Sequence, residues 1–297
     1  MTSVTVQAKN GGIDLHAHTS ASDGSLSPTE LISLAVETGL SAIAVTDHDT
    51  LGGLAEAAEA AKRMNIELVP GVELSVEDEG GRFHLLGYLF YPQDEKLSAA
   101  LISIRESRAL RNVEMAEKMR ELGLPVTMDD VRAEAGPDSQ VIARPHFAKA
   151  LMKAGIVSSV QEGFDLYLAT GKPLYQPKQV LTPHDAIALI HGAGGIAVMA
   201  HPGLIPLGEA ELAARVASLA ADDHLDGIEA HYSQHSPEQT RRFLRIAEEN
   251  DLIVTAGSDY HGTPKPHVTL GVIENGAAAS PTLLDEMRLR AARNCGD

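Results

Sequence analysis

The chain has 297 residues, of which 44% are hydrophobic and 4% aromatic, with no tryptophan. This length suits one large α/β domain with an insertion, and its core must be mainly aliphatic. A formal net charge of −17 excludes a uniformly basic surface for nucleic acid, and the single cysteine excludes an intrachain disulfide. The N-terminus lacks a basic segment followed by an apolar one, and no apolar run approaches the ~20 residues that cross a bilayer, so we expect a cytoplasmic protein.

The basic residues are unevenly distributed. The segment from Lys96 to Lys178 contains 12 lysines and arginines against 10 aspartates and glutamates, so the rest of the chain carries −17 − 2 = −19. Half of the 24 basic residues therefore lie in this one segment. A solvated helical surface would explain this balance, but a cap that meets an anionic substrate explains it better when the rest of the chain is considered.

Helices and strands alternate in both end regions of the chain. Ser27, Pro28 and Glu30 give the capping pattern that starts a helix, and Gly39 is a typical residue to end it. Continuous apolar runs between helices are typical of strands in a parallel sheet. In the first region we predict a strand ending at 16, a helix over 27–39, a strand over 42–45, a helix over 54–64 and a strand over 67–69 that leads into 72–75. A hairpin-type turn at 79–81 then precedes a strand over 82–89. The last region predicts helices over 182–191, 209–219, 236–248 and 281–293, and strands over 196–199, 227–229 and 252–256.

The middle of the chain has a different pattern. Apolar residues recur at helical spacing from Leu97 to Leu122, with no strand of comparable quality. Shorter helical segments are predicted near 128–135, 144–154 and 158–169. We interpret 96–175 as an all-helical insertion, a substrate cap, in a barrel made of 1–95 and 176–297. Seven strands that alternate with helices predict a parallel α/β barrel with its active site at the C-terminal ends of the strands.

Polar side chains gather at those strand ends. His16 and His18 can aim two imidazoles at one point, because residues i and i+2 of a strand point to the same face. Neutral imidazole is a favoured ligand of zinc, iron and manganese. Further histidines and carboxylates follow or lie in the other strands, so a barrel mouth would collect nine candidate ligands: His16, His18, Asp23, His48, Glu73, His84, His201, Asp259 and His261.

Nine ligands exceed the need of one ion, and two or three ions that share a carboxylate would use them all. The proposed sharing is His16, His18, Glu73 and Asp259 on one ion, Glu73, His84 and His201 on a second, and Asp23, His48 and His261 on a third. Three divalent cations and three carboxylates leave a charge of about +3, which favours a polyanionic substrate. Ions ~3.5–4 Å apart can hold a bridging hydroxide that attacks phosphorus. The site therefore predicts phosphoester hydrolysis.

Five motifs resemble those of the PHP (polymerase and histidinol phosphatase) domain family. They are DLHAHT with His16 and His18, TDHD with Asp47 and His48, PGVELS with Glu73, AHPG with His201, and SDYHG with Asp259 and His261. The resemblance implies a distorted (β/α)7 barrel with an all-helical insertion, two or three metal ions (manganese, with iron or zinc as alternatives) and hydrolysis of phosphomonoesters or phosphodiesters. Within the family the chain is similar to stand-alone bacterial nucleoside 3′,5′-bisphosphate phosphatases, some of them related to 5′-to-3′ exonucleases on short RNA.

Substrate contacts are predicted mainly in the insertion. Arg144 precedes Pro145, which suits the first turn of a helix, so its guanidinium can bind phosphate beside free backbone N–H groups. Arg108 and Arg111 share one helix face. The full set of predicted substrate contacts is Asp23, Arg108, Arg144, His146 and Lys178. The alternative for these side chains is a structural role, in capping or packing, or simple exposure to solvent.

His231, after the sixth strand, is predicted as the acid for the leaving group or as a substrate contact; a surface or packing role is the alternative. The function that we predict is removal of the 3′-phosphate from a nucleoside 3′,5′-bisphosphate by a metal-bridging hydroxide. The alternatives are a histidinol-phosphate phosphatase, a 5′-to-3′ exonuclease on short RNA, and a non-catalytic metal-binding domain. The expected partner is a small phosphorylated substrate, with no membrane; the sequence does not give the oligomeric state.

Overall fold

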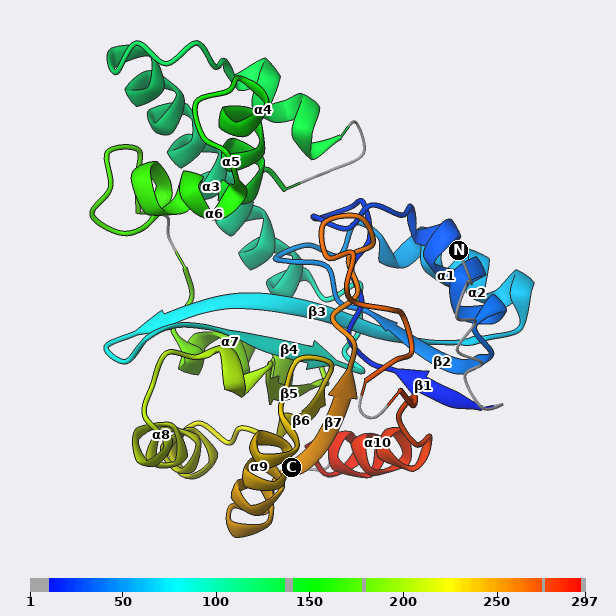
Figure 1. Cartoon of the computed structure of the whole chain (residues 1–297). Helices are drawn as coiled ribbons and strands as arrows, with labels where there is room; N and C mark the ends of the chain where they lie inside the picture. Colours follow the sequence, from blue (N-terminus) through cyan, green and yellow to red (C-terminus); the bar gives the residue numbers. More distant parts are fainter. Residues whose placement is uncertain (1–10, 137–140, 178–179, 274–275, 295–297) are drawn as a thin grey trace.

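The computed structural model describes residues 11–136, 141–177, 180–273 and 276–294. Figure 1 shows one sheet with helices around it and a separate group of helices above its upper edge. The strands are β1 (Gly12–Asp14), β2 (Leu40–Val45), β3 (Glu67–Asp78), β4 (Gly81–Tyr88), β5 (Ile196–Met199), β6 (Gly227–Tyr232) and β7 (Ile253–Gly257). The helices are α1 (Pro28–Glu37), α2 (Leu54–Met64), α3 (Glu95–Glu121), α4 (Met128–Ala135), α5 (Arg144–Lys153), α6 (Val160–Gly163), α7 (Pro183–Gly192), α8 (Glu209–Asp222), α9 (Pro237–Glu249) and α10 (Thr282–Asn294), with a π-helical turn η1 (Phe164–Leu168) and a 3₁₀ turn η2 (Pro202–Leu204).

The seven strands pair in the order in which they occur in the chain. All neighbours are parallel except β4, which is antiparallel to both β3 and β5. The predicted parallel barrel is therefore parallel except at this strand, which follows the hairpin-type turn predicted at 79–81. The physical reason is the short turn after Asp78, where Gly81 has φ +100°, because so short a connection can only join antiparallel neighbours.

Backbone hydrogen bonds join the two edges of the sheet just beyond the ends of β1 and β7. Leu15 N–H donates to Ala256 O at 3.1 Å, Asp259 N–H to His16 O at 2.8 Å, and His18 N–H to Tyr260 O at 2.9 Å. The sheet therefore closes into a distorted seven-stranded barrel, as predicted. These bonds also set the two histidines of the first strand end directly beside the polar residues that follow β7.

The alternation of β2 divides its side chains between two cores. Ala42 and Ala44 pack inside the barrel, whereas Ile43 and Val45 pack toward the outer helices. Met287 of α10 belongs to the inner core, and α10 lies at the end of the barrel away from the helical group (Figure 1). The other end is thus left for polar side chains.

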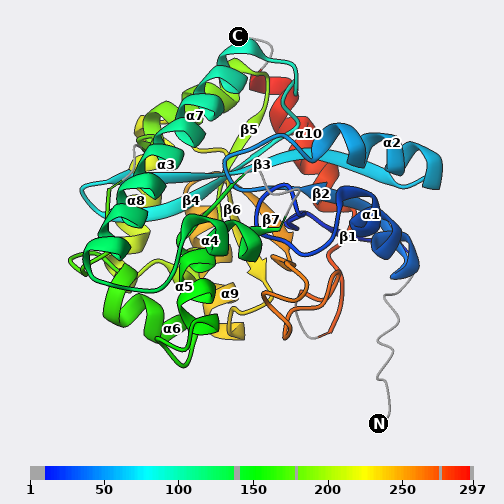
Figure 2. The same ribbon diagram turned by 90° about the horizontal axis from the view of Figure 1, so that it is seen from above.

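The helical group is linked to the barrel by one long helix, α3. Leu97, Leu101 and Ile104 near its start pack in the barrel core, while Met115 and Met119 pack in a second core of the helical group. Figure 2 shows α4, α5 and α6 gathered on one side of the barrel strands. The predicted helical insertion is confirmed, and the predicted 158–169 helix is instead split between α6 and η1. None of the described helices is long and apolar enough to span a membrane.

Candidate metal centre

The structure brings all nine predicted ligands to the mouth of the barrel. They come from the segments after β1, β2, β5 and β7 and from β3 and β4 themselves. Their donor atoms form four overlapping groups, each with all atoms within 4.8 Å of one another. The groups are His18, Asp23, His48 and His261; His16, Glu73 and His201; His16, His18 and Asp259; and His48, Glu73 and His84. These groups differ from the predicted division of ligands among three ions. His18 also lies near Asp23, and His48 also lies near Glu73.

Glu73 of β3 lies at the centre of the nine. Its Oε2 is 3.1 Å from His18 Nε2, 3.1 Å from His48 Nδ1 and 3.3 Å from His16 Nε2. Its Oε1 is 2.8 Å from His84 Nδ1 and 2.9 Å from His201 Nε2. One buried carboxylate thus faces five imidazoles, which is the arrangement expected of a ligand shared between ions.

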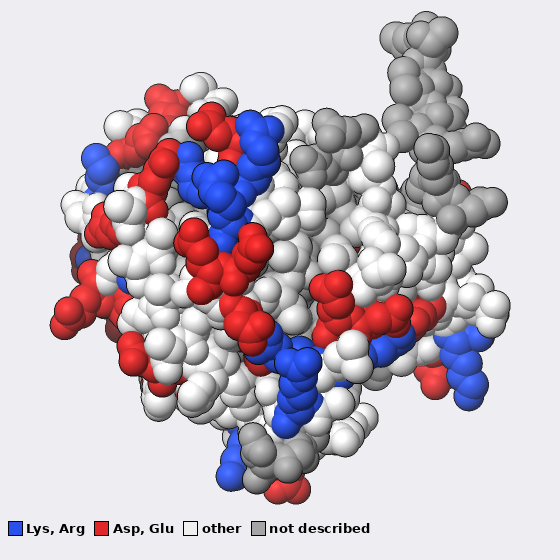
Figure 3. Space-filling model, turned by 90° about the horizontal axis from the view of Figure 1, so that it is seen from below, with Lys and Arg blue, Asp and Glu red and all other residues white. Residues whose placement is uncertain are grey.

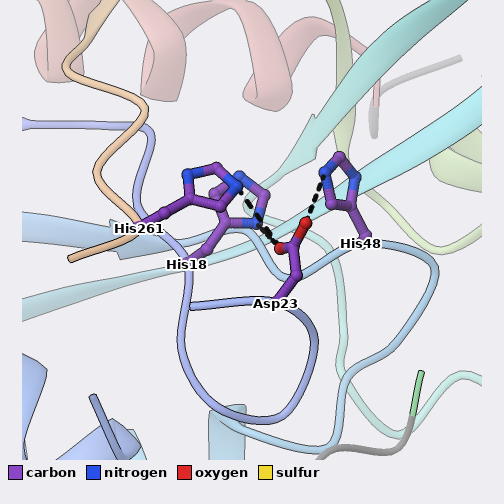
Figure 4. A group of neighbouring side chains, drawn as sticks. All are labelled: His18, Asp23, His48 and His261. Carbon is purple, nitrogen blue, oxygen red and sulfur yellow. Dashed lines mark ion pairs between the residues drawn. The ribbon is translucent and has the colours of Figure 1, made fainter. Parts of the chain in front are cut away.

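Asp23 faces the outer group of histidines (Figure 4). Its Oδ1 is 3.3 Å from His261 Nε2 and 3.6 Å from His18 Nδ1, and its Oδ2 is 3.8 Å from His48 Nε2. The loop that carries Asp23 is anchored on Asp47, whose carboxylate accepts hydrogen bonds from the backbone and side chain of Thr19 and from Ser22 Oγ. Asp23 is therefore held toward the cavity.

The pattern of unsatisfied polar atoms in the centre is the one expected of a site for divalent cations. Buried nitrogens of His16, His18 and His48 that face the centre, together with Glu73 Oε2, make no hydrogen bond of good geometry. Buried polar atoms in proteins are nearly always satisfied, so converging lone pairs without donors indicate a place for cations. Burial lowers the pKa of His48 to about 3, whereas at His18 burial is outweighed by Asp259 and Glu73, which raise the pKa to about 9. A histidine binds metal as the neutral ring, so cations would displace the proton from His18.

Three polar residues support the ligands and were not predicted from the sequence. Glu229 of β6 is fully buried and faces both His16 and the backbone N–H of His201. Tyr232 donates its hydroxyl to Asp259 Oδ2 at 2.8 Å, and Lys265 Nζ lies 2.5 Å from the same oxygen. An isolated glutamate in the apolar run of the sixth strand was the available signal for the first of these.

Three residues of this region have positive φ although they are not glycine: Asp49 (51°), His201 (26°) and Asp259 (58°). This left-handed backbone is unfavourable for residues with a side chain. Each lies just after a strand, where the chain must turn sharply while it presents a side chain to the barrel mouth.

A cavity of about 240 Å3 opens between the metal centre and the helical insertion. Asp23, His48 and His84 line it on the barrel side. Four arginines line it with them: Arg82, Arg108, Arg111 and Arg144. On the underside of the molecule, by contrast, basic and acidic side chains lie next to one another (Figure 3). This gathering of arginines beside the centre predicts an anionic ligand.

The arginines differ in their partners. Arg108 pairs with the buried carboxylate of Asp49. Arg111 donates to Asn112 Oδ1, and no acidic side chain in the described part of the chain forms an ion pair with it. Burial, together with the charges of Arg108, Arg144 and then Arg82, lowers the pKa of Arg111 to about 9. Such a crowded cation is stabilised by a bound anion.

Arg144 begins α5, as predicted, and its guanidinium lies 5.8 Å from the ring centres of Phe164 and of Tyr175. Its Nη1 also donates to Leu168 O at 3.2 Å. These contacts fix the direction of the guanidinium toward the cavity.

Three predicted contacts have other outcomes. His146 is buried but does not line the cavity, and its Nδ1 accepts the Ala143 N–H at 3.1 Å, so its role as a substrate contact stays a prediction. Lys178 lies outside the described residues. His231 lines a different hollow, with Ile273 and Leu283, so its role as leaving-group acid stays a prediction.

Known proteins resemble the chain over most of its length. A model of the PHP domain matches residues 14–127. The 3′,5′-nucleoside bisphosphate phosphatase of Chromobacterium violaceum is 37% identical over 249 residues, covering 84% of this chain and 87% of that protein. The 5′-3′ exoribonuclease of Haemophilus influenzae is 37% identical over 248 residues, covering 84% and 89%. A solved structure from Bifidobacterium adolescentis, named as a candidate metal-dependent phosphoesterase, aligns with a TM-score of 0.81 at 34% identity and covers 95% of this chain and 97% of that one.

The fold, the ligand cluster and these relatives together define a metal-dependent phosphoesterase. More narrowly, the chain belongs to the PHP family, as its motifs predict.

Proposed function

We propose that this protein removes the 3′-phosphate from nucleoside 3′,5′-bisphosphates, with two or three divalent cations held by the nine clustered residues. The observation that carries the proposal is the arginine cavity beside the metal centre. A substrate with two phosphates can place one at each of these two positions. A monophosphate would leave either the centre or the arginines without an anion.

The bound cations would lower the pKa of a water nucleophile and offset the charge that develops at phosphorus. The side chains supply the positioning. Glu73 fixes the five imidazoles around it, and Asp23 and His48 lie where the centre meets the cavity. Arg111 and Arg144 offer planar guanidinium groups that suit bidentate phosphate binding. The scissile phosphate is thereby held at the centre through its partner phosphate.

Manganese is our proposal for the resident ion, with iron or zinc as alternatives, because imidazole and carboxylate oxygen suit all three. The cytoplasmic location stays a prediction from the sequence.

A 5′-to-3′ exoribonuclease is the second candidate. The relatives from Haemophilus influenzae and Escherichia coli that carry this name are 37% and 35% identical to this chain. The two candidates share one chemistry. A nucleoside 3′,5′-bisphosphate has the same two phosphate positions as the first nucleotide of a 5′-phosphorylated RNA, so one pair of sites can bind both. Only the group attached beyond the 3′-phosphate differs.

Histidinol phosphate fits the cavity less well. It carries an amine where a second phosphate would lie, and the guanidinium groups of Arg111 and Arg144 would repel that positive charge.

The test is phosphate release with manganese from adenosine 3′,5′-bisphosphate, 3′-AMP, 5′-AMP, histidinol phosphate and a short 5′-phosphorylated RNA. We expect kcat/KM for the bisphosphate to exceed that for 3′-AMP by about 10–100-fold, since charge-assisted hydrogen bonds contribute ~1.5–3 kcal/mol. Equal values for these two substrates would contradict a second phosphate site. Faster release of 5′-mononucleotides from RNA would favour the exoribonuclease.

A further inference from the structure

Glu229 is a carboxylate in an unusual place. It lies on β6 inside the barrel mouth with its side chain fully buried. Among the described residues no lysine or arginine forms an ion pair with it; its ion-pair partner is His16. A buried carboxylate is costly unless specific hydrogen bonds compensate for lost water, so its contacts should explain its presence.

The first contact is with His16. Glu229 Oε1 lies 2.9 Å from His16 Nδ1. An ionised carboxylate can only accept, so it places the imidazole hydrogen on Nδ1 and leaves the lone pair on Nε2. That Nε2 has no hydrogen-bond partner and lies 3.3 Å from Glu73 Oε2 and 3.6 Å from Asp259 Oδ1. The lone pair is therefore directed at the centre.

The second contact is with the backbone of His201. Glu229 Oε2 accepts the His201 N–H at 2.7 Å. His201 has φ 26° and ψ 59°, a conformation that a residue with a side chain adopts only when its surroundings hold it there. In this conformation its Nε2 lies 2.9 Å from Glu73 Oε1. One carboxylate thus holds a ligand ring on one side and a ligand backbone on the other.

The neighbouring strand leaves space for this arrangement. A Cβ at Gly257 of β7 would lie 2.1 Å from His16 Cβ and 2.7 Å from Glu229 Oε1. Both distances are too short, so a glycine is required where His16 and Glu229 approach the backbone. The packing of β7 is an independent indication that the pair is part of the site.

We propose that Glu229 is a positioning residue of the metal centre, which fixes His16 as the tautomer with a free Nε2 and holds His201 against Glu73. This inference rests on the metal centre of the proposed function but not on its substrate. Glu229 should affect only part of the centre. Two ligand groups contain His16 or His201, whereas the group of His18, Asp23, His48 and His261 contains neither.

The test is zinc binding by Glu229→Gln, measured as ions per chain and as affinity by competition with a chelator. Glutamine has one acceptor oxygen, so it cannot accept from both His16 and His201. Its amide group must either face the His201 N–H or donate to Nδ1 and move the ring hydrogen to Nε2. Loss of such a supporting contact typically weakens metal binding by about 10–100-fold. We expect this loss for part of the bound zinc and near-normal affinity for the remainder.

Asp226 provides a matched control. It is also buried at the start of β6, and its Oδ2 also lies close to one imidazole, His191 Nε2 at 2.7 Å, and accepts one backbone N–H, from Ala197 at 2.8 Å. It precedes β6, at the opposite end from the metal centre. Asp226→Asn should lower the melting temperature and leave zinc affinity unchanged. Wild-type zinc binding by Glu229→Gln, or an equal loss in both variants, would overturn the proposal.

The wild-type protein gives a test that does not depend on the folding of a variant. In the zinc-loaded, 15N-labelled full chain, we expect the His16 ring to show a hydrogen on Nδ1 and zinc on Nε2. The reverse assignment would overturn the proposal. The substrate is judged separately: loss of zinc in Glu229→Gln together with no bisphosphate preference in the wild type would retain the positioning role and reject the proposed substrate.

Discussion

The metal centre and the arginine cavity face each other across the barrel mouth, but the chain builds them in different ways. The centre uses short segments at the ends of neighbouring strands, so the sheet itself sets the spacing of its side chains. The cavity joins one arginine of β4 to three from the helical insertion, which has its own core. The centre is thus fixed by hydrogen-bonded strands, whereas the cavity depends on how a second core is placed over it.

The two regions also differ in electrostatics. The centre combines carboxylates with buried histidine nitrogens that no hydrogen bond satisfies, while the cavity gathers four arginines. This difference suggests that chemistry depends on the first region and substrate choice on the second. Variants in each region can test that division.

The largest effect is expected for Glu73→Gln. It removes the charge that faces five imidazoles, so hydrolysis of every substrate should fall by on the order of 10³-fold, with loss of bound metal. Elemental analysis and phosphate release measure both quantities. Glu67→Gln on the same strand is the control, since Glu67 is half exposed and pairs with Arg288, and its activity should stay normal. If the Glu73→Gln enzyme keeps its metal and its normal turnover, the proposed role of the centre in hydrolysis is wrong.

An intermediate effect is expected for Arg144→Ala. KM for adenosine 3′,5′-bisphosphate should rise by about 10–100-fold, while KM for 3′-AMP changes little, because the lost guanidinium binds only the second phosphate. Arg144→Lys should lie between, since it keeps the charge but loses the planar fork. Arg132→Ala, an exposed arginine of the insertion, should match the wild type. Equal rises for both substrates would show that Arg144 supports the fold of the insertion and not the choice of substrate.

The smallest effect, and one of opposite sign, is expected for Arg111→Met. Three other arginines and burial disfavour the charge of Arg111, so its replacement by an apolar side chain of similar length should stabilise the free protein by about 1 kcal/mol or more. Chemical denaturation measures this gain. The same variant should bind bisphosphate more weakly. If the variant is less stable, the contacts of Arg111 contribute more to stability than burial of its charge and repulsion by the other arginines cost.

The clustering of the nine candidate ligands could be predicted because strand ends can be recognised in a sequence. Each apolar run that ends in histidine or carboxylate indicates a polar group at one edge of the sheet, and the structure brings all nine together. Their pairing into groups could not be predicted, since it depends on side-chain directions. Glu229 was missed because a single acid in an apolar strand has no distinctive spacing, and its partners lie far away in the chain.

The position of His231 away from the arginine cavity has a definite cause. Regular alternation from Glu229 would point His231 into the barrel. The register between β6 and β7 shifts between these two residues, as in a β-bulge, and the shift turns Tyr232 inward instead. A bulge is a property of two paired strands, so one strand alone does not reveal it. The direction of β4, by contrast, is indicated by the hairpin-type turn predicted before it.

The left-handed backbone at His201 has a consequence for the evolution of the chain. Glycine would relieve a cost of ~1–3 kcal/mol at this position, but it would delete a candidate metal ligand. Random variants selected for heat resistance alone should therefore accumulate glycine here and lose turnover. Those selected for turnover should keep the histidine and gain their heat resistance elsewhere. Durability and activity are in direct conflict at this position.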